Sequence, residues 1–133
     1  MKTYTDLEQS KKLTGILPLE SADMIYMPMM DIDSMSNSGF FSIPECYPFN
    51  EFKDSNNKPL PCWSLAALSE FILPYIADDD GDIYKFYLSK DDLDRWIAYY
   101  KSDDASIYIC EESDNMIDVI LEMVCWLKKE EYI

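Results

Sequence analysis

The sequence contains no histidine, although it has 133 residues. Histidine is the usual general base near neutral pH and the commonest metal ligand, so its absence removes Ser-His pairs, Cys-His pairs and most catalytic zinc sites. The four cysteines, Cys46, Cys62, Cys110 and Cys125, are widely spaced and form no CxxC pair. The sequence therefore predicts free thiols and neither a disulfide framework nor a zinc site.

Basic residues are scarce, because 11 Lys and Arg stand against 26 Asp and Glu, for a net charge of -15. Residues 70–122 hold fifteen acids and four bases, a net of -11. Such a field repels phosphate backbones and anionic lipid, so we expect no direct binding to nucleic acid or to membranes. The chain also lacks the ~18-residue apolar run of a membrane span and the apolar run of a signal peptide, which predicts a cytoplasmic protein.

The acidity does not predict disorder, since disorder requires few aromatic residues as well as high charge. Hydrophobic residues make up 48% of the chain and aromatic residues 14%. The length is typical of one domain with one core. We therefore predict a single compact domain over residues 1–133, with a long irregular segment at about residues 28–61 that is rich in Pro, Ser, Asn and Gly.

Helices are predicted in the first half of the chain. Thr5 and Glu8 have the spacing of a capping box, so a helix is expected over about residues 6–14. A proline begins a second expected helix at about residues 18–24, because proline suits the first helical turn. Apolar residues at helical spacing predict a central helix over about residues 64–73.

Three β-prone runs follow, at residues 84–88, 95–100 and 106–110, and polar turns separate them. An antiparallel meander is the simplest arrangement. The middle run has a rival interpretation, in which residues 89–92 cap a helix that carries Trp96. The aromatic content of this run favours a strand.

The last helix has the clearest signal. Ser113 or Asp114 is placed to cap it, and Lys128 and Lys129 lie near its end, as the helix dipole favours. Its apolar positions share one face and are Met116, Ile120, Met123, Val124 and Leu127. The predicted fold class is α+β: N-terminal helices, a central helix, a three-stranded antiparallel meander and a long C-terminal helix packed on the sheet.

Four segments, LEQSKKL, ESADMIY, PCWSLAALSEFI and NMIDVILEMVCWL, occur in this order. In these segments the chain resembles a family of small uncharacterised proteins encoded in bacterial genomes and phage-like elements. The resemblance implies one compact intracellular domain that ends in the last helix and an origin in a mobile element. It implies no activity, ligand or catalytic residue.

The stretch ADDDGD at residues 77–82 has the composition of a metal-binding loop but not the spacing. With Gly81 at position 6 of an EF-hand loop, position 1 is Ile76 and position 12 is Tyr87, so two strong ligands are missing. The stretch is therefore predicted to be a solvated turn. No pair of acids stands out for carboxylate catalysis of the kind that glycosidases use, so we expect a non-enzymatic protein with no metal and no cofactor, and a carboxylate-dependent enzyme is a further alternative.

One hypothesis for the function is a protein-interaction module. Alternation along the strands places Tyr84 on one face of the sheet and Tyr87 on the other, and likewise Trp96 and Tyr99. If helices cover one face only, aromatic residues remain exposed for an unidentified protein partner or a second copy; alternatively, helices or the irregular segment cover both faces. The candidate partner surface comprises Tyr84, Tyr87, Trp96, Tyr99 and Tyr108.

The alternative hypothesis is an acidic mimic of DNA that inhibits a basic nucleic-acid-binding protein. Its motivation is the net charge of residues 70–122, although an acidic surface that serves only solubility explains the same charge. The candidate acidic surface comprises Asp78, Asp79, Asp80, Asp82, Asp91, Asp92, Asp103, Asp104, Glu111 and Glu112.

Overall fold

The computed structural model describes residues 2–29, 39–51, 58–104 and 106–133, apart from the side chains of Tyr108 and Cys110. The chain forms two compact units, Tyr4–Ala67 and Leu68–Ile133, and the first residues belong with the second unit. The fold is α+β, with three α-helices and two antiparallel sheets among the described residues.

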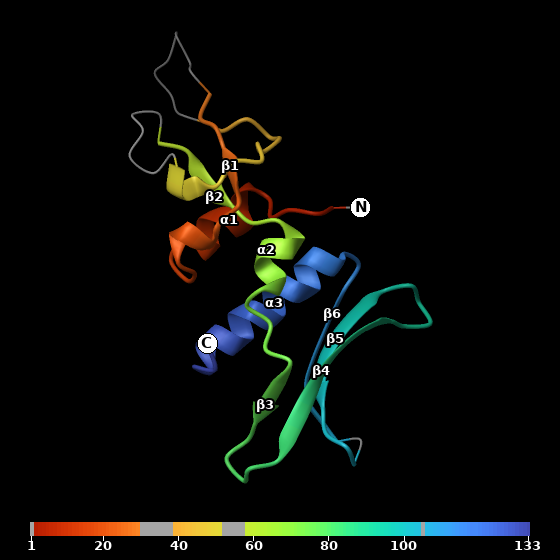
Figure 1. The fold of residues 1–133 in the computed structure, drawn as a ribbon. Helices are drawn as coiled ribbons and strands as arrows, with labels where there is room; N and C mark the ends of the chain where they lie inside the picture. The colour runs from red at the N-terminus through yellow and green to blue at the C-terminus, as the bar shows by residue number, and fades with distance from the viewer. Residues whose placement is uncertain (1, 30–38, 52–57, 105) are drawn as a thin grey trace. The chain divides into compact units, whose positions relative to one another are not determined.

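The first unit contains short elements joined by loops (Figure 1). Strand β1 pairs with β2 in an antiparallel sheet, in which Met24 lies opposite Cys62. Isolated bridges join Ile25 to Glu45 and Pro28 to Phe40, so parts of the segment predicted as irregular pair with β1 and the residues that follow it. Positions 30–38 and 52–57 of that segment lie outside the described residues. The elements are α1 (Leu7–Leu13), η1 (Leu19–Ser21), β1 (Met24–Tyr26), η2 (Phe49–Glu51) and β2 (Leu60–Cys62).

Helix α1 lies where the sequence predicts it, but its capping box is shifted by one residue. Asp6 is the N-cap and accepts from the Gln9 backbone, while the Gln9 side chain accepts from the Asp6 N–H. The prediction that Thr5 caps the helix with Glu8 was wrong. Thr5 is fully buried, and its hydroxyl accepts from the Trp63 N–H at 3.1 Å.

The second predicted helix was also wrong, because the chain makes only the 3-10 turn η1 and then enters β1. All three residues of β1 are buried, which suits a strand covered on both faces and not an amphipathic helix. The central helix α2 (Leu65–Ser69) is shorter than predicted. Ser64 Oγ caps it by accepting from the Ala67 N–H, and Asp23 in turn binds the backbone and hydroxyl of Ser64.

The second unit is a four-stranded antiparallel sheet with one long helix (Figure 1). The predicted meander is present as its last three strands, and the strand interpretation of residues 95–100 is confirmed over its rival helix. A fourth strand, β3, was missed because only three residues pair. The strands are β3 (Tyr75–Ala77), β4 (Ile83–Lys90), β5 (Trp96–Lys101) and β6 (Ile107–Ser113), in this spatial order.

Helix α3 (Met116–Lys129) confirms the predicted C-terminal helix and packs against β5 and β6. Its N-cap is Asn115 and not Ser113 or Asp114; Ser113 Oγ accepts from the Asn115 N–H. The Lys2 ammonium group binds Asp118 in the first turn at 2.9 Å. The buried residues of α3 are Ile117, Val119, Ile120, Leu121, Met123, Val124 and Leu127.

Candidate functional site

Helix α3 covers one face of the four-stranded sheet. Ala98 and Tyr100 on β5 are fully buried on this face, and the Tyr100 ring lies 6.3 Å from the Trp126 ring of α3. The register places Tyr84 and Trp96 on the same face. Tyr84 is buried, and the Lys90 ammonium group lies 5.0 Å from the Trp96 ring centroid. Two of the five residues of the candidate partner surface therefore belong to the helix-covered face.

The opposite face keeps large side chains exposed. Tyr75 is 56% exposed, Ile83 54% and Tyr87 42%. Tyr87 lies directly opposite Tyr99, and their rings stack with centroids 5.4 Å apart and an interplanar angle of 17°. We call this face the open face and define it by Tyr75, Ile83, Lys85, Tyr87, Ile97, Tyr99 and Lys101.

Two lysines lie opposite each other on the open face. Lys85 on β4 and Lys101 on β5 are Cα partners in the register. The Lys101 ammonium group lies 6.0 Å from the Tyr87 ring centroid. The open face therefore combines aromatic rings with positive charge, in a chain whose net charge is -15.

A shallow groove borders the open face at the β3 edge. Its volume is about 310 Å³, and its walls are Pro74, Tyr75, Lys85, Phe86 and Tyr87. The Phe86 N–H donates to the Pro74 carbonyl at 3.0 Å, which holds the chain before β3 against β4. The groove offers apolar walls and one ammonium group to a ligand.

The three turns between the strands of this sheet share one hydrogen-bond pattern. In each turn, the backbone N–H of the first residue donates to the carbonyl four residues later, at 2.9–3.0 Å. The side chain of the same first residue accepts from the N–H of that later residue, at 2.8–3.2 Å. The pairs of residues are Asp78 with Asp82, Asp91 with Arg95, and Ser102 with Ser106.

The fourth residue of the first two turns has a left-handed backbone, with φ of +88° at Gly81 and +62° at Asp94. Three-residue hairpin loops with a glycine bulge require such a conformation, which Gly and Asp tolerate best. Asp78 also accepts from the Asp80 N–H and from the Tyr84 hydroxyl. The stretch ADDDGD is therefore built as a hairpin turn, and Asp78 serves the turn with both carboxylate oxygens.

The candidate acidic surface is divided between the two ends of the sheet. Successive turns of a meander lie at opposite ends, so residues 78–82 and 103–104 occupy one end and residues 91–92 the other. Glu112 on β6 lies opposite Ile97, at the border of the open face, and binds Arg95 at 3.1 Å. Glu111 lies on the helix-covered face, where burial and the nearby Glu122 raise its pKa.

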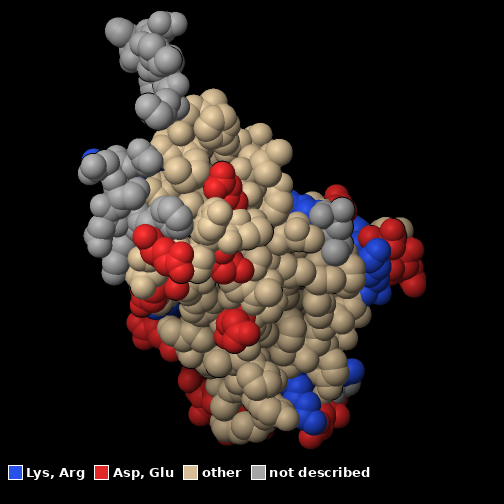
Figure 2. Space-filling view, turned by 45° about the horizontal axis from the view of Figure 1, so that its top comes forward, with Lys and Arg blue, Asp and Glu red and all other residues tan. Residues whose placement is uncertain are grey.

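Figure 2 shows the acidic side chains of one view in several separate groups, with uncharged surface between them. At the end of the sheet that holds two turns, an open hollow of about 390 Å³ includes Asp82, Asp103 and Asp104 in its lining. Among the residues that the structure describes, no group of three or more Asp, Glu or Cys side chains is arranged to hold a metal ion.

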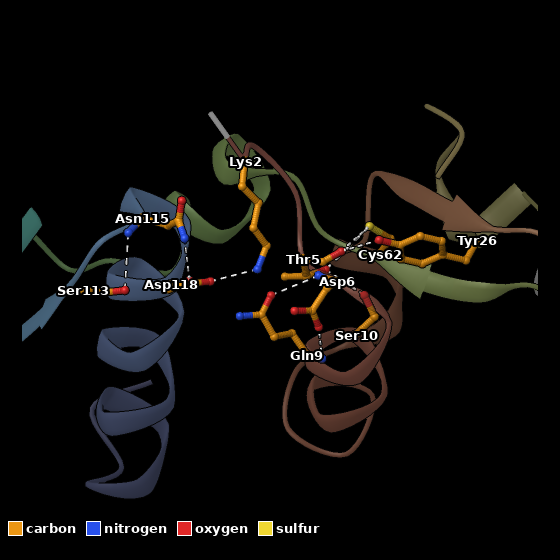
Figure 3. A network of polar contacts seen from close by, with 10 residues as sticks. All are labelled: Lys2, Thr5, Asp6, Gln9, Ser10, Tyr26, Cys62, Ser113, Asn115 and Asp118. Carbon is orange, nitrogen blue, oxygen red and sulfur yellow. Dashed lines mark hydrogen bonds and ion pairs between the residues drawn. The ribbon is translucent and has the colours of Figure 1, made fainter. Parts of the chain in front are cut away.

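The first unit contains a buried polar cluster that sequence reasoning missed. Thr5 and Ser10 share a hydrogen bond of 2.7 Å, the Tyr26 hydroxyl donates to the Thr5 carbonyl at 2.7 Å, and Cys62 Sγ lies 3.5 Å from that carbonyl (Figure 3). Burial raises the pKa of the Cys62 thiol and of the Tyr26 phenol. Both groups therefore stay protonated and unreactive, and the cluster connects the start of the chain to β2.

The open face brings together only Tyr87 and Tyr99 of the candidate partner surface, and the side chain of Tyr108 lies outside the described residues. Tyr75 was not predicted as part of the site because β3 was not predicted, and Lys85 and Lys101 were not predicted either. The alternation that separated Tyr84 from Tyr87 also assigns Lys85 to the side of Tyr87, and on the next strand it assigns Lys101 to the side of Tyr99, so this part of the signal was present in the sequence. The register that joins the two sides into one face comes from the structure.

In the described part of the chain, no disulfide bond is formed by Cys46, Cys62 or Cys125. No helix in the described part of the chain has the length and apolar character needed to cross a membrane. Comparison with protein-family models, with curated proteins and with solved structures finds no match for this chain. The family resemblance seen in the sequence stays a prediction.

Proposed function

We propose that this chain is a non-enzymatic protein-interaction module that binds its partner through the open face of the four-stranded sheet. One observation carries the proposal: α3 covers one face, whereas Tyr75, Ile83 and Tyr87 on the other face are 42–56% exposed. Contiguous exposed apolar and aromatic side chains are typical of protein interfaces, in which tyrosine is enriched.

The stacked pair of Tyr87 and Tyr99 supports this proposal further. The two rings already contact each other before a partner binds. A partner that covers them buries apolar area at little cost in side-chain entropy, because a tyrosine has only two side-chain torsions to fix. Rigid aromatic residues near the centre of a patch are the residues that carry most of the binding energy in measured interfaces.

The alternative, an acidic mimic of DNA, draws no support from the described residues. A mimic must present carboxylates in a continuous array at phosphate-like spacing. Here the acids lie at two ends of the sheet, and Asp78 and Asp91 are engaged in holding their own turns. Turn geometry thus accounts for Asp78 and Asp91 without a basic partner.

The test is site-specific photo-crosslinking in the cells that naturally express the protein. A photoreactive residue replaces Tyr87 on the open face, and in a matched variant it replaces Asp92, which is exposed in the β4–β5 turn. We expect a discrete adduct with one polypeptide at position 87 and none at position 92. Equal adducts at both positions, or none at position 87, would refute the proposal.

A pair of serine variants gives an independent check. Tyr87→Ser removes a ring from the open face, while Tyr47→Ser removes a similarly exposed ring, 49% exposed, from the other unit. The interaction should weaken with Tyr87→Ser and persist with Tyr47→Ser. An adduct between two copies of the chain would identify the partner as the protein itself.

A further inference from the structure

The cross-strand pair of Lys85 and Lys101 is unfavourable by itself. Like charges directly opposite each other on neighbouring strands destabilise a sheet. Three other cations of the same unit, Lys2, Lys90 and Arg95, each bind an acid at 2.9–3.1 Å. Within the described part of the chain, neither Lys85 nor Lys101 has such an ion pair, although acids outnumber bases more than twofold. A negative group from outside the chain would relieve this repulsion.

Apolar surface lies directly beside the two lysines. Lys85 has Tyr75 opposite it on β3, and Tyr87 follows two residues later on the same face. The groove of about 310 Å³ between Tyr75 and Tyr87 has mainly apolar walls. A ligand that matches this surface carries one apolar side chain next to one negative group.

The charges around the open face favour a protein ligand over a nucleic acid. Both ends of the sheet carry aspartates in their turns, and residues 70–122 have a net charge of -11. A chain of phosphates brings many negative charges into this field and loses most of the attraction of two lysines. A protein segment brings a single carboxylate to the lysines and uncharged groups elsewhere.

We propose that the open face binds a protein segment in which a carboxylate lies beside an apolar side chain. The carboxylate pairs with Lys85 and Lys101, and the apolar side chain enters the groove between Tyr75 and Tyr87. This inference rests on the proposed function and assigns the chemistry of the partner: acidic at this position, in contrast to the basic partner that the net charge suggests.

The test uses the full chain and three blocked heptapeptides, Gly-Ser-Glu-Phe-Glu-Ser-Gly and its counterparts with Gln or Lys in place of both Glu residues. Binding is followed by amide chemical shifts of β4 and β5 in NMR titrations, where so short a segment is expected to bind at roughly millimolar affinity. The glutamate peptide should bind about fivefold more tightly than the glutamine peptide, which corresponds to about 1 kcal/mol for two exposed ion pairs.

Charge variants test whether the preference for the glutamate peptide depends on Lys85 and Lys101. The double variant Lys85→Glu with Lys101→Glu should reverse the preference, so that the lysine peptide binds best, while Lys85→Arg with Lys101→Arg should keep it. The matched control, Lys128→Glu with Lys129→Glu, makes the same charge change at the exposed end of α3 and should leave the preference unchanged. Circular dichroism confirms that each variant is folded.

The outcomes separate the two proposals. If all three peptides shift the open-face amides equally, or if charge reversal leaves the preference intact, acid recognition is refuted while the open face remains an interaction face. If an oligothymidylate of eight nucleotides binds the open face more tightly than the glutamate peptide, the ligand is a nucleic acid and the inference is wrong. If no peptide shifts these amides but cross-linking at position 87 succeeds, acid recognition fails alone; if both fail, the proposed function fails as well.

Discussion

Replacement of Asp78 by alanine should destabilise the sheet although it removes one charge from an acidic region. Asp78 accepts from the N–H groups of Asp80 and Asp82, at 3.0 and 2.8 Å, and from the Tyr84 hydroxyl at 3.1 Å. A carboxylate that holds turn or helix N–H groups contributes about 1–2 kcal/mol, since the N–H groups of an exposed loop regain water when the carboxylate is lost. We therefore expect the free energy of unfolding to fall by about 1–2 kcal/mol.

The matched control is Asp79→Ala, in the same loop. Asp79 is exposed, and its side chain makes no hydrogen bond to any residue that the structure describes, so its removal relieves repulsion and loses none of the described contacts. Urea denaturation gives the overall stability, and hydrogen exchange of the β4 amides reports the unit that contains the turn. Asp78→Asn retains a carbonyl oxygen as acceptor and should recover at least part of the loss. Equal effects of Asp78→Ala and Asp79→Ala would refute the assignment of Asp78 to the turn.

Three further predictions concern the backbone, the alkaline pH range and the thiols. Gly81→Ala should lower stability by about 1–2 kcal/mol in urea denaturation, because φ of +88° is strained for any residue with a Cβ atom; an unchanged midpoint would contradict the turn geometry. Burial raises the pKa of the Tyr100 phenol to about 12 from its usual value near 10. Between pH 10 and 12 this phenol is ionised in the unfolded chain but still protonated in the folded chain. Its contribution to stability is therefore complete below pH 10 and is lost between pH 10 and 12. Between pH 9 and pH 11, the free energy of unfolding of the wild type should therefore fall by roughly 1 kcal/mol more than that of Tyr100→Phe. Equal losses in the two proteins would show that ionisation of Tyr100 does not cause the loss of stability. In thiol labelling mapped by mass spectrometry, exposed Cys46 should react first and buried Cys62 only on unfolding, and early labelling of Cys62 would exclude the buried cluster.

Elements with long, repeated patterns could be predicted from the sequence. Helix α3 has four turns of apolar spacing, and β4 and β5 are runs of six or more residues rich in β-branched and aromatic side chains. In such elements, many residues support the same structure, so a single exception does not change the prediction. The two faces of each strand followed from the alternation of side chains that any strand imposes.

Short elements could not be predicted, because tertiary contacts decide them. Residues 24–26 form β1 only because Leu60–Cys62 lies beside them, 36 positions later in the chain, and no local period indicates this pairing. Strand β3 has three residues, too few for alternation to be recognised. Thr5 has the composition and spacing of an N-cap, but its hydroxyl is used in the buried cluster with Ser10, so Asp6 takes the cap.

Of the candidate site, the side chains on each face of a strand could be predicted, but not which face remains exposed. Alternation assigns each side chain to a face, but only the packing of α3 shows which face is covered, and this divided the predicted aromatic set between the two faces. The net charge was a poorer guide than the face assignment. It is a sum over the chain, whereas a partner contacts one surface.

If the open face binds the partner, as we propose, its local charge should decide the chemistry of that partner more than the net charge of the chain does. At physiological ionic strength, exposed charges more than about 8 Å apart are largely screened. A carboxylate beside Lys85 and Lys101 interacts mainly with these two groups, and the aspartates at the ends of the strands act mainly on the rate of approach. An acidic segment would thus approach the chain slowly, because the aspartates repel it. Once bound, it would be held by the two lysines and by the groove between Tyr75 and Tyr87. Association should then become faster with added salt, whereas binding of a basic partner to the acidic turns would become slower.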